Sequence, residues 1–455
     1  MKILLITTNT ESIPDPVFPL GASYISGALK ENLIDHKLLD LCFSQNYEND
    51  IKTAILDYSP DIVAMSLRNI DTTSYPNFIS YIPFYKEIIQ IIKNISNALI
   101  IVGGAGFSIM PKEIINNINA DLGIVGEGEN NFVSLIKKFE NNSEYIKKIN
   151  NNLIFKNDNE FQNDYETDAI PDRNGFDINK YYKNGGMLNI QTKRGCPFKC
   201  IYCTYPVIEG RNIRQRHPKS VCDEIDQLLK LDIKSLFIVD NEFLFPDEHV
   251  ISICNEIIKR KQLINWSCYA NPGLLTDELA HLMVEAGLKS IDFGSDAAND
   301  KMLYNLGKNF TVKDLFKASQ ICEKNSIKYC HSIILGGPGE TMDTVKMTLD
   351  NILDISPTIV TCLVGIRIYP NTKLYKIAIE EKIIEPDNNL LEPCFYISKD
   401  IRDKILPYID NFSKNNPDWF FPGFRNDSYK KIQKGLRKLG YKGPLWEHLG
   451  RFKKK

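Results

Sequence analysis

Short apolar runs alternate with stretches of helical period through the first 140 residues of the chain. The apolar runs are "KILLITT", "HKLLDLCF", "DIVAMSL", "NALIIVGG" and "DLGIVGEGE", and the stretches between them include "GASYISGALKENL" and "YKEIIQIIKNI". The short runs are typical of buried strands, and the 3.6-residue period between them is typical of helices. Strand and helix in alternation predict a doubly wound α/β domain with a parallel sheet over residues 1–140.

The pattern changes twice in the rest of the chain. Residues 141–183 are rich in Asn and Asp and poor in periodicity, so we interpret them as a linker with room for a small hairpin. Over residues 184–385, six strands ("MLNIQT", "SLFIVDNE", "NWSCYAN", "SIDFGSDA", "YCHSIILGG" and "CLVGIRIYP") alternate with five helical stretches. Six such units predict a partial (β/α)6 TIM-type barrel, open on one side, with its chemistry on the loops after the strands. Residues 386–455 are expected to form a small helical C-terminal extension.

Two helices of the second half are expected to begin with a capping box. The spacing is present between Ser220 and Asp223 and again between Thr311 and Asp314. In a capping box the hydroxyl group accepts a backbone N–H of the first turn, and the acidic side chain reaches back to the cap residue. The sequence therefore predicts helix starts at Ser220 and Thr311.

Composition narrows the class of protein. A chain of 455 residues with 43% hydrophobic residues can bury a large core, and a net charge of -2 disfavours nucleic acid as a partner. The opening "MKILLITTNTESIPD" reaches a carboxylate too early for a secretory segment, and no uncharged run approaches the roughly 18 residues of a membrane span. Eleven scattered cysteines fit a reducing compartment, so a cytoplasmic location is expected. Eight of them are expected to be small packed hydrophobes: Cys42, Cys222, Cys254, Cys268, Cys322, Cys330, Cys362 and Cys394.

Glycines and polar residues follow the strands of the first half. They occur in "SLRNID" (66–71), "GGAGFS" (103–108) and "GEGE" (126–129), where a doubly wound sheet binds its ligands. A nicotinamide or flavin dinucleotide would require glycines directly after the first strand, but this chain has "NTESIPDPVFPLG" there. The sequence therefore disfavours a dinucleotide, while tight turns in an unliganded sheet remain an alternative.

Three cysteines stand close together after the first strand of the expected barrel. In "TKRGCPFKCIYC", Cys196, Cys200 and Cys203 form a CxxxCxxC motif. A structural zinc site or a structural iron-sulfur cluster commonly uses four protein ligands, and no fourth ligand lies nearby in the sequence. Three thiolates on a four-iron cluster would leave one iron open, as a catalytic cluster needs.

A CxxxCxxC motif after the first strand of a partial barrel resembles the radical S-adenosylmethionine (SAM) superfamily. The resemblance implies a four-iron four-sulfur cluster whose open iron binds SAM and passes it an electron. The resulting 5′-deoxyadenosyl radical abstracts hydrogen from an unactivated carbon, and the protein supplies orientation and excludes water. It also implies a low-potential electron donor such as flavodoxin or ferredoxin.

The resemblance implies roles for residues around the cluster. Tyr202 would pack near the adenine of SAM. The family's Gly-Gly-Glu segment is replaced here by "VDNEF", so Asp240, Asn241 or Glu242 is expected to bind the amino group. The remaining expected SAM contacts are Ser295 and Asp296 at the ribose and Gly336 and Gly337 beside the adenine.

The first half is similar to the cobalamin-binding domain of the cobalamin-dependent radical SAM group, through "FPLG", "SLRNID", "GGAGFS" and "GEGE". The chain lacks the Asp-x-His-x-x-Gly segment that supplies a histidine to cobalt, and His36 is interpreted as an ordinary surface residue. Arg68 is the candidate residue beneath the cobalt, with a salt bridge at the strand end as its alternative role. The expected cobalamin contacts are Ser66, Arg68, Gly103, Gly104, Gly126, Glu127 and Gly128.

Methylation of an unactivated carbon is the leading function that the resemblance implies, with one SAM supplying the methyl group through cobalamin and a second supplying the radical. A rearrangement or cyclisation with the same cofactors remains open, as does a non-catalytic cobalamin or iron-sulfur sensor. Methylthiolation of tRNA is disfavoured, because it needs three further cysteines in the first domain and only Cys42 is there. "GIRIYPNTKLY", "NNLLEPCFYIS" and "NPDWFFPGF" resemble a subgroup associated with lipid biosynthesis, so a small lipid or natural product is the expected substrate.

Overall fold

The structure is a computed structural model that describes residues 1–12, 15–141, 153–156, 170–424 and 434–449. Its first domain is a six-stranded sheet in the order β2-β1-β3-β4-β5-β6, with every pairing parallel. The strands are β1 (Ile3–Thr7), β2 (His36–Asp40), β3 (Ile62–Ser66), β4 (Leu99–Gly103), β5 (Leu122–Ile124) and β6 (Leu153–Phe155). The helices are α1 (Leu20–Glu31), α2 (Tyr47–Tyr58), α3 (Ile82–Ile95), α4 (Ala105–Ile109), α5 (Pro111–Ile118) and α6 (Gly128–Asn141). The predicted doubly wound α/β fold is confirmed.

The strand order explains why the first sheet can bind a ligand at one place. The chain leaves β1 in one direction to form β2 and in the other to form β3, so a switch point lies between β1 and β3. All five residues of β1 are buried, because helices cover both faces of the sheet. A ligand therefore has access only at the carboxyl ends of the strands, where the glycine segments lie.

The interpretation of residues 141–183 as a linker with a hairpin was partly wrong. Strand β6 lies inside this segment and extends the first sheet in parallel with β5. A helix, α8 (Ile178–Gly185), follows, and Tyr181 on this helix donates a hydrogen bond of 2.8 Å to Asp40 in the first domain. Residues 142–152 and 157–169 lie outside the described residues.

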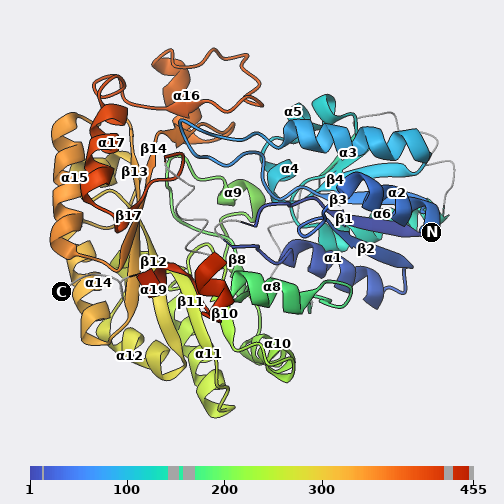
Figure 1. Ribbon diagram of the computed structural model, residues 1–455, viewed down its shortest axis with the longest axis horizontal. Helices are drawn as coiled ribbons and strands as arrows, with labels where there is room; N and C mark the ends of the chain where they lie inside the picture. Colours follow the sequence, from blue (N-terminus) through green and yellow to red (C-terminus); the bar gives the residue numbers. More distant parts are fainter. Residues whose placement is uncertain (13–14, 142–152, 157–169, 425–433, 450–455) are drawn as a thin grey trace.

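The second domain is a seven-stranded parallel sheet in the order β17-β14-β13-β12-β11-β10-β7. Its strands are β7 (Leu188–Ile190), β10 (Ser235–Ile238), β11 (Asn265–Ala270), β12 (Leu288–Asp296), β13 (Lys328–Leu335), β14 (Ile359–Val364) and β17 (Trp419–Phe420). Figure 1 shows α10 (Pro218–Lys230), α11 (Asp247–Lys259), α12 (Asp277–Glu285), α14 (Val312–Lys324) and α15 (Met342–Ile355) along the outer side. Because β7 and β17 do not pair with each other, the barrel is partial, as predicted.

The seventh strand corrects the expectation of a wholly helical C-terminal extension. Trp419 and Phe420 pair in parallel with Val360 and Thr361, and Trp419 packs against Phe412 at 5.0 Å between ring centroids. The aromatic residues of this segment therefore lie at the open edge of the barrel sheet. The other elements are β8 (Lys193–Arg194), α9 (Tyr205–Ile208), β9 (Arg214–Gln215), a 3-10 helix (Pro272–Leu274), α13 (Asp300–Asn305), β15 (Ile366–Arg367), α16 (Lys373–Glu380), β16 (Phe395–Tyr396), α17 (Ile405–Asn415) and α19 (Trp446–Leu449).

One of the two predicted capping boxes is confirmed. Thr311 caps α14, and Asp314 accepts the Thr311 backbone N–H at 2.8 Å. The prediction at Ser220 was wrong, since α10 begins at Pro218 with His217 as its cap. Proline is favoured in the first helical position, because its missing N–H would have no partner there, so the helix begins two residues earlier than expected.

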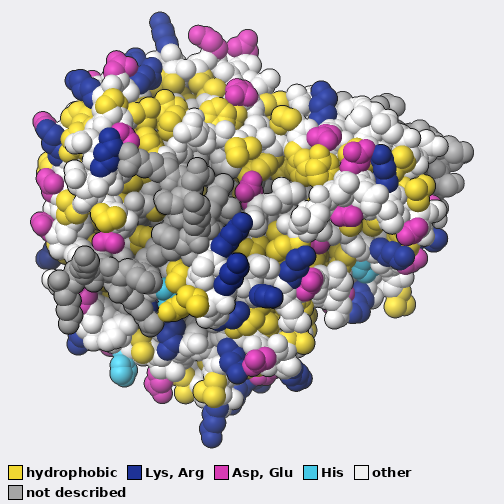
Figure 2. All heavy atoms as spheres, in the orientation of Figure 1, with side chains coloured by type: hydrophobic (Ala, Val, Ile, Leu, Met, Phe, Trp, Pro, Cys, Tyr) yellow, Lys and Arg dark blue, Asp and Glu magenta, His cyan; other side chains and the backbone are white. Residues whose placement is uncertain are grey.

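The buried cysteines fit the expectation closely. Of the eight expected to be packed, seven are buried and Cys394 is half-buried. His36 is also half-buried rather than a plain surface residue, with its ring bonded to the Ser26 hydroxyl at 2.9 Å and the Ile34 carbonyl at 3.0 Å. Within the described residues, no helix is both long and apolar enough to cross a membrane. Figure 2 shows a group of basic side chains near the middle of one face, with acidic side chains around it.

Candidate functional site

The loop from Cys196 to Cys203 is held in place by backbone contacts from three directions. The Cys196 N–H donates to the Gly210 carbonyl at 3.2 Å, and the Ile201 N–H donates to the Leu306 carbonyl at 3.0 Å. Gly195 precedes the loop with a φ of 91°, and a Cβ there would lie 2.0 Å from the Asn212 carbonyl oxygen. Only glycine fits this position, so the residue before the first cysteine fixes the entry of the loop.

The three cysteines of this loop, Cys196, Cys200 and Cys203, lie within electrostatic reach of one another and are half-buried. Burial raises the pKa of all three thiols, that of Cys203 to about 12, and Lys308 opposes this shift at Cys200. No three His, Cys, Asp or Glu side chains of the described residues are grouped to hold a single metal ion. A donor set of three soft thiols that is not closed around one ion fits an iron-sulfur cluster better than zinc.

Tyr202, Asp296 and Lys308 form a buried polar group beside Cys200. The Tyr202 hydroxyl donates a short hydrogen bond to Asp296, and Lys308 Nζ lies 2.5 Å from the same carboxylate. Burial alone would lower the pKa of Lys308, but Asp296 and Cys200 raise it above its usual value. Lys308 therefore stays positively charged next to the thiols. The sequence predicted Tyr202 and Asp296 but missed Lys308, which lies three residues beyond the short helix α13.

The three side chains of the segment "DNE" after β10, residues 240–242, make contacts with different parts of the chain. Asp240 is fully buried, and its carboxylate accepts hydrogen bonds from the Thr192 N–H at 2.7 Å and the Thr192 hydroxyl at 2.5 Å. Asn241 instead donates to Glu209 at 2.5 Å. Glu242 lies within electrostatic reach of Cys196, and burial raises the pKa of Glu242 to about 7. Of the three candidates for the amino group of SAM, Glu242 is the one whose charge acts on a cysteine of the loop.

The other expected SAM residues are largely occupied by contacts within the chain. Ser295 is fully buried and bonds to His331 Nδ1 at 2.7 Å. The N–H groups of Gly336 and Gly337 both donate to Glu340, the latter at 2.9 Å. The buried Glu340 carboxyl group thus holds the turn at Gly336 and Gly337. Burial raises the pKa of Glu340 to about 7.

A cavity of about 360 Å³ lies at the carboxyl ends of the first sheet. All seven residues expected to contact cobalamin line it: Ser66, Arg68, Gly103, Gly104, Gly126, Glu127 and Gly128. Gly21, from "FPLG", also lines the cavity, and a Cβ at this position would meet nothing within 4 Å. The exposed side chain of Arg68 belongs to the wall, and no histidine does. A glycine-lined cavity without histidine fits a cobalamin whose lower face lacks a histidine ligand.

Residues of the barrel close the other side of this cavity. Tyr205 and Ile208 on α9, together with Glu209, lie two to six residues beyond Cys203 and line the cavity as well. Glu209 accepts hydrogen bonds from Gln191 at 3.0 Å and from Asn241 at 2.5 Å. Burial raises the pKa of Glu209, although Arg194 and its hydrogen-bond donors oppose the shift. The same short stretch of chain therefore joins the cysteine loop to the cavity.

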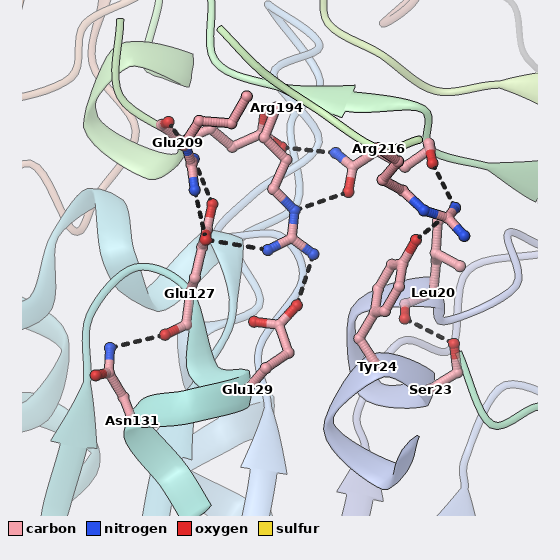
Figure 3. A network of polar contacts seen from close by, with 11 residues as sticks. Leu20, Ser23, Tyr24, Glu127, Glu129, Asn131, Arg194, Glu209 and Arg216 are labelled. Carbon is pink, nitrogen blue, oxygen red and sulfur yellow. Dashed lines mark hydrogen bonds and ion pairs between the residues drawn. The ribbon is translucent and has the colours of Figure 1, made fainter. Parts of the chain in front are cut away.

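Ion pairs cross between the two domains at this place (Figure 3). Arg194 lies 3.2 Å from Glu127 and 2.6 Å from Glu129, and Arg214 binds Glu127 through two nitrogens at 2.8 and 2.5 Å. Glu127 is thus held by two arginines of the barrel. If it also binds cobalamin, as expected from the sequence, it does so while these ion pairs are in place. From the sequence, Glu129 was noted only as part of "GEGE" and Glu209 was missed, because their partners come from distant segments.

Two family models match the chain, one for each domain. The "B12 binding domain" model matches residues 6–136, and the "Radical SAM superfamily" model matches residues 190–352. Among curated relatives, tryptophan 2-C-methyltransferase of Streptomyces laurentii is 24% identical over 82% of this chain and 74% of the relative. The anaerobic magnesium-protoporphyrin IX monomethyl ester cyclase of Cereibacter sphaeroides is 26% identical over 78% of this chain and 60% of the relative.

Solved structures show the same fold. The radical S-adenosylmethionine methyltransferase TsrM from Kitasatospora setae, with cobalamin and a [4Fe-4S] cluster bound, superposes with a TM-score of 0.85 at 22% identity. The match covers 99% of this chain and 97% of that chain, so it spans both domains. The chain thus carries a B12-binding domain ahead of a radical SAM domain, the arrangement that its sequence predicted, and it shares the fold of that methyltransferase.

Proposed function

We propose that the protein methylates an unactivated carbon of a small molecule, with a four-iron four-sulfur cluster, SAM and cobalamin as its cofactors. The observation that carries this proposal is the junction at α9, where the chain passes from Cys203 directly into the wall of the glycine-lined cavity. Two cofactors that act on one substrate have to lie close together. When bound, the cluster supplies an electron to SAM, and cobalamin carries the methyl group.

We assign the cluster to Cys196, Cys200 and Cys203, and the neighbouring side chains to SAM. The Glu242 carboxylate can accept hydrogen bonds from the amino group of SAM, and its charge already acts on Cys196. Tyr202 and Lys308 both contact Asp296, and Lys308 acts on Cys200. The positive charge of Lys308 favours the thiolate form of Cys200, which is the form that binds iron. We assign Asp240 and Ser295 an indirect role, in which their hydrogen bonds hold the strand ends that carry the SAM residues.

We assign the cavity at the first sheet to cobalamin. The glycines let the backbone approach a large planar ligand closely, as expected from the sequence. Arg68 is exposed on the cavity wall, and none of the ion pairs among the described residues involves it. This favours its role beneath the cobalt over the alternative of a salt bridge at the strand end. Gln191, Glu209 and Asn241 then line the barrel side of the cofactor.

A rearrangement or cyclisation with the same cofactors is the second candidate function. It is supported by the relative from Cereibacter sphaeroides, which is a cyclase, whereas the relative from Streptomyces laurentii is a methyltransferase. The similarity to the methyltransferase covers a larger share of both chains than the similarity to the cyclase does, so methyl transfer is the first proposal. Products of SAM distinguish the two: methyl transfer forms S-adenosylhomocysteine as well as 5′-deoxyadenosine, and a cyclisation forms none of the former.

Metal content tests the proposal most directly. Protein prepared without oxygen from cells supplied with cobalamin should hold about four irons and one cobalt per chain. Cys200→Ala should lose the iron and keep the cobalt, while the matched control Cys254→Ala, on the outer helix α11, should keep both. Reduction requires a low-potential donor such as flavodoxin or ferredoxin. Iron retained at full level in Cys200→Ala would refute the cluster assignment.

A further inference from the structure

The two faces of the barrel sheet differ in exposure. On the outer face, Cys268, Ile291 and Cys362 are 0% exposed, because helices cover them. On the inner face, Tyr269 is 44% exposed although it lies in the middle of the sheet. Successive residues of a strand point to opposite faces. The inner face is itself buried at Ser267, Ser290 and Cys330, so it is open beside Tyr269 and not along its whole length. Gly294 is exposed, and a Cβ there would meet nothing within 4 Å, so open space, called the hollow below, borders this part of the sheet.

The floor of this hollow is closed by the C-terminal part of the chain. Glu447 on α19 accepts hydrogen bonds from Ser267 at 3.1 Å and from Ser290 at 2.5 Å, and Lys328 donates to the Glu447 carbonyl at 2.5 Å. Ser267, Ser290 and Lys328 lie near the amino ends of β11, β12 and β13. Among the described residues, the C-terminal part of the chain thus covers the amino ends of these three strands, and the carboxyl ends lie at the opposite end of the hollow.

The open end of the hollow faces the cavity at the first sheet. Gln191 after β7 and Asn241 after β10 line that cavity, so the carboxyl ends of barrel strands border it. A molecule held in the hollow would thus lie between the floor and the two proposed cofactor sites. This is the place that a substrate of both cofactors has to occupy.

One carboxylate, that of Asp292, points into the hollow. Asp292 lies opposite Tyr269 on β11 and Cys330 on β13, two residues above Ser290, and Ser332 donates to its Oδ1 at 2.9 Å. Burial raises the pKa of Asp292 to about 6, with Ser332 and Cys330 opposing the shift. In the part of the chain that the structure describes, no lysine or arginine forms an ion pair with it. Asp292 is half-buried, so its carboxylate keeps some access to water, and a bound cation would give it the positive partner that no described lysine or arginine supplies.

The wall beside Asp292 is aromatic. The rings of Tyr269 and Phe237 pack edge to face with centroids 4.8 Å apart, on the two strands next to β12 toward β7. Flat or unsaturated groups pack well against such a wall, and cations are attracted to the ring faces. The hollow thus combines the Asp292 carboxylate, and the Glu447 carboxylate of its floor, with an aromatic wall, and a purely hydrocarbon chain would leave the Asp292 carboxylate without a partner.

We propose that Asp292 binds a positively charged nitrogen of a small substrate whose flat body lies against Tyr269 in the hollow of the barrel. This inference rests on the proposed function and adds the chemical class of the substrate to it. A neutral lipid, which the C-terminal segments suggested, would leave the Asp292 carboxylate without a partner.

A matched pair of probes tests this assignment on the anaerobic protein loaded with cluster and cobalamin. Benzylamine, protonated at pH 7.5, and benzyl alcohol, which is neutral, differ in charge but hardly in shape. We expect calorimetric titration to show benzylamine binding at least tenfold more tightly than the alcohol, and Asp292→Asn to remove this preference. Asn can still accept the hydrogen bond from Ser332, so the variant should fold. Asp343→Asn, at an exposed position of α15, is the matched control and should keep the preference.

A second variant tests the place independently of the charge. Gly294→Leu would project a side chain into the hollow and should prevent both probes from binding, with iron and cobalt retained. Equal binding of the two probes to the unaltered protein, or an unchanged preference in Asp292→Asn, would overturn the role of Asp292. Undiminished binding in Gly294→Leu would show that the probes do not bind in the hollow. Absence of iron and cobalt from the unaltered protein would instead refute the proposed function, which separates the two failures.

Discussion

Arg194 of the barrel and Glu129 of the first domain form a buried ion pair at 2.6 Å. Burial alone would raise the pKa of Glu129, but Arg194 lowers it below its usual value, so the pair is charged on both sides. Arg194 stands two residues before Cys196, and Glu129 lies in the first turn of α6. The contact therefore fixes the cysteine loop relative to the glycine segment that lines the cavity.

Arg194→Met should destabilise the protein by about 3–5 kcal/mol, because it leaves the buried carboxylate of Glu129 and the half-buried one of Glu127 without one of their partners. Thermal unfolding followed by circular dichroism measures the loss. Lys52→Met, which breaks the exposed pair with Glu48 on α2, is the matched control and should cost less than about 0.5 kcal/mol. Equal losses in the two variants would contradict the account of the buried pair.

Gly195→Ala should abolish the binding of iron while the chain remains folded. The added Cβ would lie 2.0 Å from the Asn212 carbonyl at a φ of 91°, so the backbone before Cys196 has to move. The iron content of anaerobically reconstituted protein gives the measurement. Gly435→Ala is the matched control, since a Cβ there meets nothing within 4 Å. Full iron content in Gly195→Ala would show that the loop tolerates this shift.

Arg68→Ala should change the absorption spectrum of bound cobalamin and leave the iron content unaltered. The side chain is exposed on the cavity wall, and its removal would let water reach the lower face of the cobalt. Arg402→Ala, an exposed arginine outside the cavity, should leave the spectrum unchanged. An unchanged spectrum in Arg68→Ala would remove this residue from the cobalamin site.

The features that sequence could predict are those with a local cause. The strands of both sheets follow from short apolar runs, and the cysteine motif and the glycine segments are contiguous in the chain. The features that it missed depend on packing between distant segments. Glu209 meets Asn241 only because α9 folds back over the end of β10, and Asp292 becomes isolated only because the inner face of the sheet stays open.

Two of the predictions made from the sequence were wrong for the same reason. Strand β6 is too short for its period to be recognised within a polar segment, and it forms because β5 offers a free edge. Ser220 has the spacing of a helix cap, but the proline at position 218 begins the helix earlier. In both places the neighbouring structure decides between alternatives that the local sequence leaves open.

Glu340 makes the stability of the barrel depend on pH. Burial raises the pKa of its carboxyl group from 4.5 to about 7, and no described residue hydrogen-bonds its Oε1. The folded protein therefore holds this proton more tightly than the unfolded chain does. The resulting stabilisation is present in full below pH 4.5 and is lost as the pH rises through 7, with a total on the order of 3 kcal/mol.

Glu340→Gln should remove this dependence, because glutamine accepts the N–H groups of Gly336 and Gly337 without carrying a charge. Unfolding midpoints of the variant and the unaltered protein should change relative to each other between pH 4.5 and 8, with the variant gaining as the pH rises. The difference between the two proteins isolates Glu340 from other titrating groups such as Glu242. A difference that stays constant over this range would mean that the Glu340 carboxyl group does not titrate there in the folded protein.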